Sequence, residues 1–266
     1  MAELSTVQPP ESVFDGVVVP AAVETVARGR PLRPVWQNAL GGLTYEISDV
    51  NARFFVKFAP SDSGLPLRQE AERLAWASEY TPVPRVVGTG EDESGFWMIS
   101  EALPGRSAVD AIWRKNPEKA VKAIAYGLRQ LHEALPVDGC PFDWGVEHRL
   151  AISPRDLSEA DEIHRDIPID VAWARATDPP PVDRLVVCHG DACSPNTLLD
   201  DDGEWSGHVD MAALGTADRW ADLAVASWAL NWNYGDGWEP LFFATYGIES
   251  DPGRIAYYRL LWDLGP

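Results

Sequence analysis

The sequence has few cysteines and no long apolar run. Three cysteines in 266 residues are too few, and an odd number, for a disulfide framework. The apolar segment Val17-Val18-Val19 is too short for a signal-peptide core and ends at Pro20. No stretch reaches the roughly 20 apolar residues that a membrane-spanning helix needs. We therefore expect a cytoplasmic protein that has no signal peptide.

Basic residues are scarce relative to acidic ones. The chain has 22 Lys and Arg against 41 Asp and Glu, which gives a formal net charge of −19. Such a surface repels phosphate backbones and anionic lipid headgroups, so we expect neither nucleic acid nor membrane partners. It would attract a polycation, although acidity alone also aids solubility. The 45% hydrophobic content is enough for a real core, in one large domain or two modest lobes.

The first hundred residues alternate in a way that is typical of strands. Residues 43–47 and 53–58 are rich in aromatic and β-branched side chains, and turn-forming residues 48–51 separate them, which predicts an antiparallel hairpin. Residues 66–80 have the periodicity of a helix, and residues 85–88 and 96–99 read as two further strands. We expect residues 1–100 to form a small N-terminal lobe that ends before the ALPG segment at 102–105.

The remaining sequence, residues 101–266, has a mainly helical pattern. Residues 118–135 place apolar side chains on one face, as a core helix requires. Short strands are predicted at 185–188, 197–199 and 205–209, and helices at 219–232, 237–246 and 252–263. Asp251 and Pro252 form a good helix start, with the acid as the N-cap. We expect a C-terminal lobe that carries the catalytic loop and the substrate pocket.

Three polar residues in the segment 186–224 suggest a specific chemistry. Asp191 follows a strand, Asn196 comes five residues later, and Asp210 stands at the end of the next hairpin. Phosphoryl transfer needs a carboxylate that accepts the proton of the attacking hydroxyl, and oxygen ligands for magnesium. The spacing fits the protein-kinase arrangement, so we predict Asp191 as the catalytic base and Asn196 and Asp210 as metal ligands.

Other residues near this segment are expected to support it. We predict that His189 orients the loop by bonding backbone, and that Asp218 and Asp222 brace the loop. Trp228, Trp232 and Trp238 are candidates for a wall on which a cation could stack.

The same arrangement requires a lysine on an N-terminal strand and a glutamate on the next helix. Lys57 lies in the apolar segment 53–58, and Glu70 lies on the predicted helix, with Glu72 as a less favoured partner. Lys57 would hold the α- and β-phosphates while Glu70 fixes its ammonium group. The segment ALGGLT at 39–44 would cover the phosphates through backbone amides.

The segments HGDACSPN at 189–196, ALGTADRWADLA at 213–224 and RIAYYRLLWDL at 254–264 resemble the aminoglycoside phosphotransferases, especially those acting at the 3′ position. The resemblance extends from the strand containing Lys57 to the C-terminus. It implies an α+β, bilobal protein-kinase-like fold, with a small antiparallel sheet lobe and a mainly helical lobe. It implies ATP, with GTP as an alternative, and Mg²⁺ as cofactors. It assigns to Asp191, Asn196, Asp210, Lys57 and Glu70 the roles given above.

The resemblance also implies binding residues that the spacing alone does not give. Ser100 and Ala102, where the two lobes join, would contact the adenine through their backbone groups. Substrate ammonium groups would be bound by four acidic residues, Glu159, Asp161, Glu162 and Asp263.

The sequence departs from the family pattern around the acceptor. The family's Asp-x-Gly-Arg segment is Asp210-Met211-Ala212-Ala213 here, and Ala229 and Trp262 occupy positions that are usually acidic. The leading hypothesis is an ATP- and magnesium-dependent kinase of a hydroxyl on a cationic aminoglycoside, of the 3′ type. An alternative is a kinase of the same fold for streptomycin, a basic cyclic peptide or a small metabolite. A third is a non-catalytic module that binds cations. The oligomeric state, monomer or dimer, stays open.

Overall fold

The computed structural model describes residues 18–38, 40–48 and 52–265. Ala39 of the predicted phosphate-covering segment and Asp49–Asn51 of the predicted hairpin turn lie outside these residues. The chain divides into two compact units, which contain residues 18–104 and 105–265 of the described part. Within the described ranges, no helix has the length and apolar character to span a bilayer.

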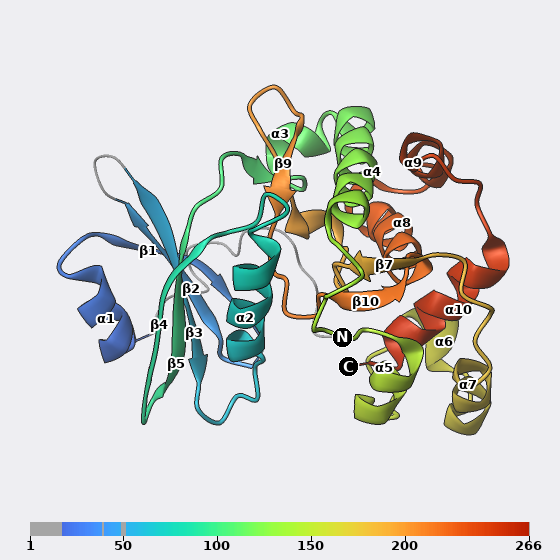
Figure 1. Cartoon of the computed structure of the whole chain (residues 1–266), viewed down its shortest axis with the longest axis horizontal. Coiled ribbons are helices and arrows are strands. Elements are labelled where there is room, and N and C mark those ends of the chain that lie inside the picture. The colour runs from blue at the N-terminus through green and yellow to red at the C-terminus, as the bar shows by residue number, and fades with distance from the viewer. Residues whose placement is uncertain (1–17, 39, 49–51, 266) are drawn as a thin grey trace. The chain divides into compact units, whose positions relative to one another are not determined.

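The N-terminal unit is an antiparallel sheet with helices packed on it (Figure 1). Its five strands lie in the order β1-β2-β3-β5-β4. Its elements are α1 (Ala21–Ala27), β1 (Leu32–Gln37), β2 (Leu43–Ser48), β3 (Arg53–Pro60), α2 (Leu67–Ala77), β4 (Val86–Asp92) and β5 (Gly95–Glu101). The predicted hairpin is confirmed, because β2 and β3 pair with Thr44 opposite Lys57. The predicted helix and the two later strands are also present as α2, β4 and β5.

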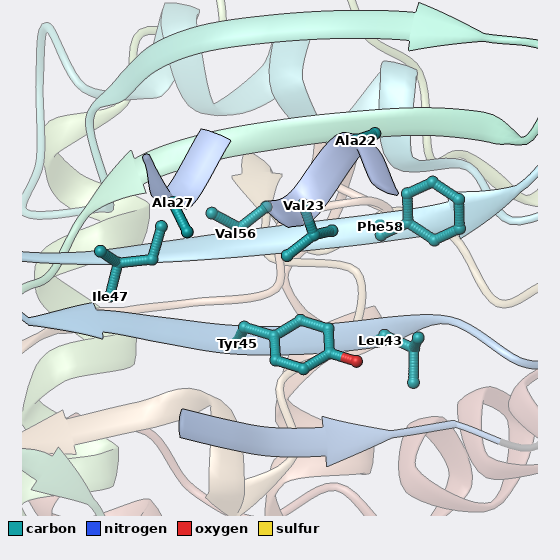
Figure 2. Packing of buried hydrophobic residues seen from close by; sticks show 8 residues of the cluster. All are labelled: Ala22, Val23, Ala27, Leu43, Tyr45, Ile47, Val56 and Phe58. Carbon is teal, nitrogen blue, oxygen red and sulfur yellow. The ribbon is translucent and has the colours of Figure 1, made fainter. Parts of the chain in front are cut away.

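The alternation of side chains along β3 decides which residues are buried under helix α1. Val56 and Phe58 join Tyr45 and Ile47 of β2 in a cluster that α1 covers with Val23 (Figure 2). Successive residues of a strand point to opposite faces, so Lys57 is directed away from α1. It reaches helix α2 on the other face of the sheet, where it bonds to Glu70. The pleat of one strand thus separates the core from the polar pair.

The C-terminal unit is mainly helical, with two small sheets in the orders β10-β7 and β6-β8-β9 (Figure 1). Its strands are β6 (Arg106–Ser107), β7 (Leu185–Cys188), β8 (Thr197–Leu199), β9 (Trp205–His208) and β10 (Gly215–Asp218), and a 3₁₀ turn, η2, covers Ser194–Asn196. Its helices are α3 (Ala111–Arg114), α4 (Pro117–Ala134), α5 (Val146–Ile152), α6 (Glu162–Arg165), α7 (Ile169–Ala176), α8 (Trp220–Tyr234), α9 (Glu239–Tyr246) and α10 (Pro252–Asp263). An antiparallel sheet followed by a helical unit confirms the predicted α+β class.

Helix α8 forms the centre of the C-terminal unit. Every residue from Trp220 to Leu230 is buried, so the helix is in contact with protein on all sides, as expected for a helix that is apolar all round. Helices α4 and α9 pack against each other, and α10 packs against α8. These contacts also fix the position of strand β10, because α8 starts directly after it.

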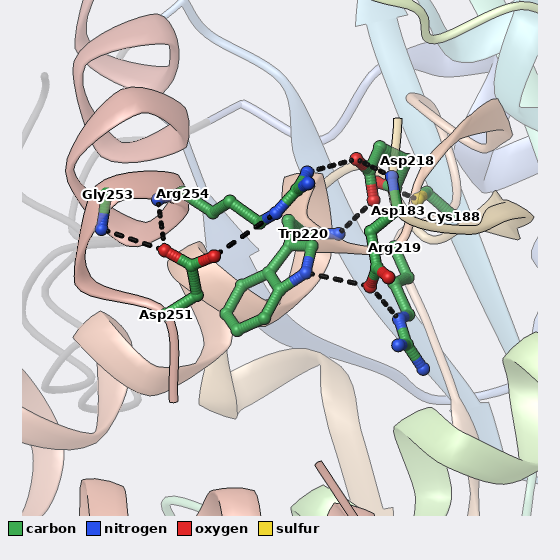
Figure 3. A network of polar contacts seen from close by, with 8 residues as sticks. All are labelled: Asp183, Cys188, Asp218, Arg219, Trp220, Asp251, Gly253 and Arg254. Carbon is green, nitrogen blue, oxygen red and sulfur yellow. Dashed lines mark hydrogen bonds and ion pairs between the residues drawn. The ribbon is translucent and has the colours of Figure 1, made fainter. Parts of the chain in front are cut away.

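A polar network ties the start of α8 to strand β7 and helix α10 (Figure 3). Asp218 accepts hydrogen bonds from the backbone of Asp183 at 2.9 Å and from Arg254 Nη1 at 3.1 Å. Asp183 in turn accepts a bond from Trp220 Nε1 at 3.0 Å. Asp251 caps α10 by accepting bonds from two backbone amides of its first turn, which confirms the predicted helix start. Asp218 therefore braces these elements, which frame the loop that follows β7.

Candidate active site

The loop after strand β7 brings two of the predicted residues into contact. Asn196 Nδ2 donates hydrogen bonds to the backbone oxygen of Asp191 at 2.9 Å and to Asp191 Oδ2 at 3.0 Å. His189 pairs through Nε2 with the carbonyl of Val209 at 2.9 Å, and its Nδ1 accepts the Asp191 amide. The predicted role of His189 in orienting the loop is therefore confirmed. Hydrogen bonds within the loop, from Asn196 and to His189, thus hold Asp191 in place.

The Asp191 carboxylate has one oxygen that is buried and unsatisfied. Oδ1 has no hydrogen-bond partner within the described part of the chain. Burial raises the pKa of Asp191 above its usual value; the charge of His189 and a hydrogen bond from Cys193 oppose this rise, and the charge of Asp210 adds to it. A carboxylate with a free oxygen and a raised pKa is suited to accept a proton from a bound hydroxyl.

Asp210 lies close enough to Asp191 to interact with it electrostatically. It follows β9 in a left-handed backbone conformation with φ 61°, which few residues other than glycine adopt. The amide of the preceding residue, Val209, donates to the carbonyl of Asn196 at 2.9 Å. This bond joins the segment before Asp210 to the end of the loop that carries Asp191. Such non-glycine outliers are concentrated at functional sites.

These residues also offer a suitable set of atoms for a hard metal ion. The Asn196 amide uses its nitrogen to hold Asp191, which leaves its oxygen as a ligand atom. With the carboxylates of Asp210 and Asp191 nearby, the donors are all oxygens, which is the set that Mg²⁺ prefers. The orphaned Asp191 Oδ1 fits a site that is completed by a ligand.

A buried carboxylate, Asp222 of α8, holds the loop from behind. It has no exposed surface and accepts the amides of His189 at 2.6 Å and Gly190 at 2.9 Å. Burial opposes its ionisation, but the hydrogen bond and charge of His132 outweigh this and hold the pKa of Asp222 below its usual value. The predicted bracing role of Asp222 is confirmed.

Sequence reasoning missed the residues that support Asp222. His132 of α4 donates through Nε2 to Asp222 Oδ2 at 2.9 Å and pairs through Nδ1 with the Tyr246 hydroxyl at 2.8 Å. In the sequence, these two residues look like ordinary members of amphipathic helices. Only the packing of α4 and α9 shows that His132 supports Asp222 and that Tyr246 supports His132.

Gly190 shows why the loop needs glycine next to its aspartate. Its φ is +82°, and a Cβ built on it would overlap the backbone carbonyl of Ala213. Position 213, where the family pattern has arginine, therefore packs against the catalytic loop. A larger residue at 190 would push these two segments apart.

In the N-terminal unit, Lys57 Nζ donates to Glu70 Oε1 at 2.6 Å. Glu70 is buried in the first turn of α2, whereas Glu72 is exposed and points away. The predicted pairing with Glu70 is thus present in the structure. A buried acceptor fixes the ammonium group at the end of a flexible side chain.

The two predicted adenine contacts lie at the end of β5. Ser100 is 5% exposed and pairs with Phe55 and Val86 on its two sides. The amide of Ala102 donates to the carbonyl of Arg53 at 2.9 Å. This amide is therefore committed to the backbone of β3, and the predicted adenine contact through backbone groups of Ser100 and Ala102 stays a prediction.

The four predicted substrate-binding acids differ in their surroundings. Glu159 and Glu162 are exposed, and the Asp161 carboxylate caps α6 by accepting the amide of Ile163 at 3.1 Å. Asp263 has a side chain with no exposed surface, and its Oδ2 accepts from His164 Nδ1 at 2.6 Å. Its other oxygen, Oδ1, is buried and has no hydrogen-bond partner in the described residues. The substrate contact predicted for Asp263 stays a prediction.

The positions that depart from the family pattern form an apolar cluster beside the loop. Ala229 is fully buried with Cys193 and Val225, and Trp262 packs against them. Ala229 and Trp262 occupy sequence positions at which the family pattern has acids, and here they pack as apolar residues.

The predicted tryptophan wall is partly occupied by a side chain of the protein. Trp228 has the Arg259 guanidinium over its ring, 5.4 Å from the centroid, and Trp232 at a centroid distance of 5.0 Å. Trp228 is therefore not free to stack on an external cation, whereas Trp232 is 37% exposed.

Comparisons with known proteins agree with this geometry. The aminoglycoside 3′-phosphotransferase of Streptomyces fradiae is 36% identical over 223 residues, which cover 76% of this chain and 81% of the relative. The crystal structure of an aminoglycoside-3′-phosphotransferase of type VIII superposes with a TM-score of 0.76 at 32% identity, over 91% of this chain and 97% of the other. The Streptomyces rimosus enzyme APH(3″)-Id, solved with ADP and streptomycin, gives 0.71 at 27% identity, over 93% and 99%.

These structures confirm the predicted kinase-like α+β fold. A model described as the phosphotransferase enzyme family matches residues 35–258, which is most of the chain. An aspartate whose buried Oδ1 has no partner in the described residues, held by an asparagine five residues later, is present within that match. The chain belongs to the APH phosphotransferase enzyme family, the family of the aminoglycoside phosphotransferases.

Proposed function

We propose that this protein transfers the terminal phosphate of ATP to a hydroxyl of a cationic aminoglycoside antibiotic, with the 3′ position favoured. The observation that carries the proposal is the Asp191 carboxylate, whose buried Oδ1 has no partner in the described residues although Asn196 holds its other oxygen. The family match and the names of the 3′-type relatives support the reaction and the class of acceptor.

Asp191 acts as the general base. Its Oδ1 accepts the proton of the attacking hydroxyl, and its raised pKa makes it a stronger base than an exposed aspartate. Asn196, His189 and Asp222 keep the loop rigid, so that the carboxylate is oriented before the substrate arrives.

Asn196 and Asp210 are the residues that would hold Mg²⁺, which supplies positive charge to the phosphates during transfer. Lys57, fixed by Glu70, binds phosphate oxygens of the nucleotide. The backbone near Ser100 lies alongside the adenine. The related Streptomyces rimosus enzyme was solved with ADP, which supports nucleotide use; ATP is the proposed donor and GTP the alternative. These cofactors fit a cytoplasmic location, which we also propose.

The acceptor is proposed to be a polycationic small molecule. The net charge of −19 and the exposed acids Glu159 and Glu162, with Asp161 between them, favour cation binding at this surface. A second acceptor, streptomycin, is favoured by the similarity to a structure that contains it.

The test is a phosphorylation assay that is read by mass spectrometry. Wild-type protein is incubated with ATP, magnesium and kanamycin A, neomycin or streptomycin, and we expect one added phosphate on at least one of them. Asp191→Asn should lower turnover by about 1,000-fold or more while ATP binding by calorimetry is retained. Asp201→Asn, an exposed turn residue of the same charge, is the matched control and should keep full activity.

Two results would contradict the proposal. Substantial activity in Asp191→Asn would remove the assigned base. A failure of wild-type protein to bind ATP in the presence of magnesium would instead favour a non-catalytic module that binds cations.

A further inference from the structure

Helix α10 ends in a carboxylate that holds another segment in place. Asp263, the last residue of α10, has no exposed side-chain surface, and its Oδ2 accepts from His164 Nδ1 at 2.6 Å and from the backbone amide of Asp161 at 3.2 Å. A buried carboxylate is costly without such donors, and here both act on Oδ2, since Oδ1 has no hydrogen-bond partner in the described residues. The pair therefore fastens the start of α6 to the end of α10.

His164 makes a second contact, with helix α8. Its ring meets Trp228 edge-on, with centroids 5.9 Å apart and planes at 78°. His164 is 8% exposed, so its ring lies between the two helices. One histidine thus joins α6 to both α8 and α10.

Both helices reach the catalytic loop next to these contacts. Trp262, which precedes Asp263, packs on the cluster of Cys193, Val225 and Ala229. Cys193 is two residues after Asp191, and Ala229 follows Trp228 on α8. The segment that His164 holds is therefore joined to helices that pack on the catalytic loop.

The segment itself has little stability of its own. Helix α6 has four residues, far fewer than an isolated helix needs, so its position depends on tertiary contacts. It carries the exposed Glu162, and Asp161 and Glu159 precede it. These are the acids proposed to bind the acceptor.

We propose that His164 is a positioning residue of the acceptor site: together with Asp263 it holds the acidic segment 159–162 against helices α8 and α10, beside the catalytic loop. The proposal rests on the function proposed above. It predicts an effect on acceptor binding alone, because in the described residues no hydrogen bond joins this pair to Asn196, His189 or Asp222, which hold the catalytic loop.

The test compares His164→Leu with His148→Leu. His148 is a half-buried histidine of α5 in ring contact with Trp144, and it serves as the matched control. For the best acceptor among kanamycin A, neomycin and streptomycin, we expect His164→Leu to raise KM about tenfold, since a hydrogen bond to a charged group is lost. The kcat and the KM for ATP should stay within about twofold of wild type. His148→Leu should change none of these.

A conservative variant separates positioning from general destabilisation. Asparagine places an N–H donor near the position of His164 Nδ1, so His164→Asn should recover most of the acceptor KM. If His164→Leu lowered kcat instead, raised the KM for ATP equally, or was not rescued by asparagine, the positioning role would be overturned.

An independent readout does not need an acceptor. Hydrogen exchange should become faster in residues 157–165 of His164→Leu and stay unchanged in strand β7. Unchanged exchange in residues 157–165 would overturn the proposal even if no antibiotic were phosphorylated. Conversely, faster exchange without phosphorylation by wild type would disprove the proposed function but not the link between α6 and α10.

Discussion

Two carboxylates of the site have opposite electrostatic surroundings. Asp191 lies on the loop after β7, and Asp222 lies behind this loop on α8. Asp191 keeps one unsatisfied buried oxygen, and burial raises its pKa. Asp222 has three hydrogen-bond donors, and its pKa is lowered despite complete burial. Asp191 is suited to accept a proton, and Asp222 is suited to hold the backbone of the loop. Different surroundings thus give two aspartates different roles.

This difference predicts stability changes of opposite sign. The folded-state pKa of Asp191 lies above its ordinary value of 3.8, so its ionisation weakens folding at neutral pH, and the cost vanishes below 3.8, where it is protonated in both states. Asp191→Asn should therefore raise the free energy of unfolding at pH 7. Asp222 has a lowered pKa, so it stabilises the fold above 3.8 and loses this effect as the pH falls through its folded-state pKa. Asp222→Asn should cost about 3 kcal/mol at pH 7.

Chemical denaturation of both variants at neutral pH and near the ordinary aspartate pKa measures these effects. Both differences from wild type should shrink in acid. Changes of the same sign at pH 7 would contradict the electrostatic assignment.

At the scale of elements, the pair formed between β3 and α2 is a unit that can be tested alone. Lys57→Met removes the ammonium group that is held 2.6 Å from Glu70. We expect kcat/KM for ATP to fall about 100-fold, the usual effect of losing one group that stabilises charge in the transition state. Steady-state kinetics at varied ATP concentration measure this.

Two variants control the interpretation of Lys57→Met. Glu70→Gln should have a smaller effect, because an amide oxygen still accepts the bond. Lys119→Met, which removes an exposed lysine of α4, should have no effect. A loss of less than about threefold in Lys57→Met would rule out its phosphate role.

Elements with a strong local pattern could be predicted from the sequence, and elements that depend on pairing could not. The alternation of side chains in β2 and β3 and the helical periodicity in α4 were sufficient to predict these elements. Strand β1 was missed because Pro34 interrupts it, and its register with β2 shifts next to this residue, as is typical of an edge strand. Strand β10, with the sequence GTAD, has no strand pattern and exists through its pairing with β7.

The same distinction holds for the site. Asp191, Asn196 and Asp210 lie within 20 residues of one another, so their spacing was informative. His132 of α4 bonds to Asp222, and Tyr246 of α9 bonds to His132, and nothing in their local sequence indicates this. Likewise, nothing in the local sequence shows that His164 bonds to Asp263.

At the scale of the whole molecule, the net charge of −19 should affect the two substrates in opposite ways. A cationic acceptor is attracted and anionic ATP is repelled, and salt screens both effects. Between about 0.02 M and about 0.3 M salt, we expect KM for the aminoglycoside to rise about fivefold or more. The KM for ATP should stay constant or fall.

Steady-state kinetics at constant magnesium test this prediction, and sucrose of equal osmolarity in place of salt is the control. A parallel rise of both constants would indicate a general effect of salt on the enzyme rather than screening of its surface charge.

The amides of His189 and Gly190 are already committed to Asp222. In many phosphate-binding proteins, consecutive main-chain N–H groups of a loop form a cradle for an anion. Here the N–H groups of His189 and Gly190 point into the protein interior, toward the carboxylate of Asp222. Because each already donates to Asp222, neither can donate to an incoming ligand. In the proposed reaction, these two amides would therefore not bind the triphosphate, and its neutralisation would depend the more on Lys57 and on the metal that Asn196 and Asp210 would hold.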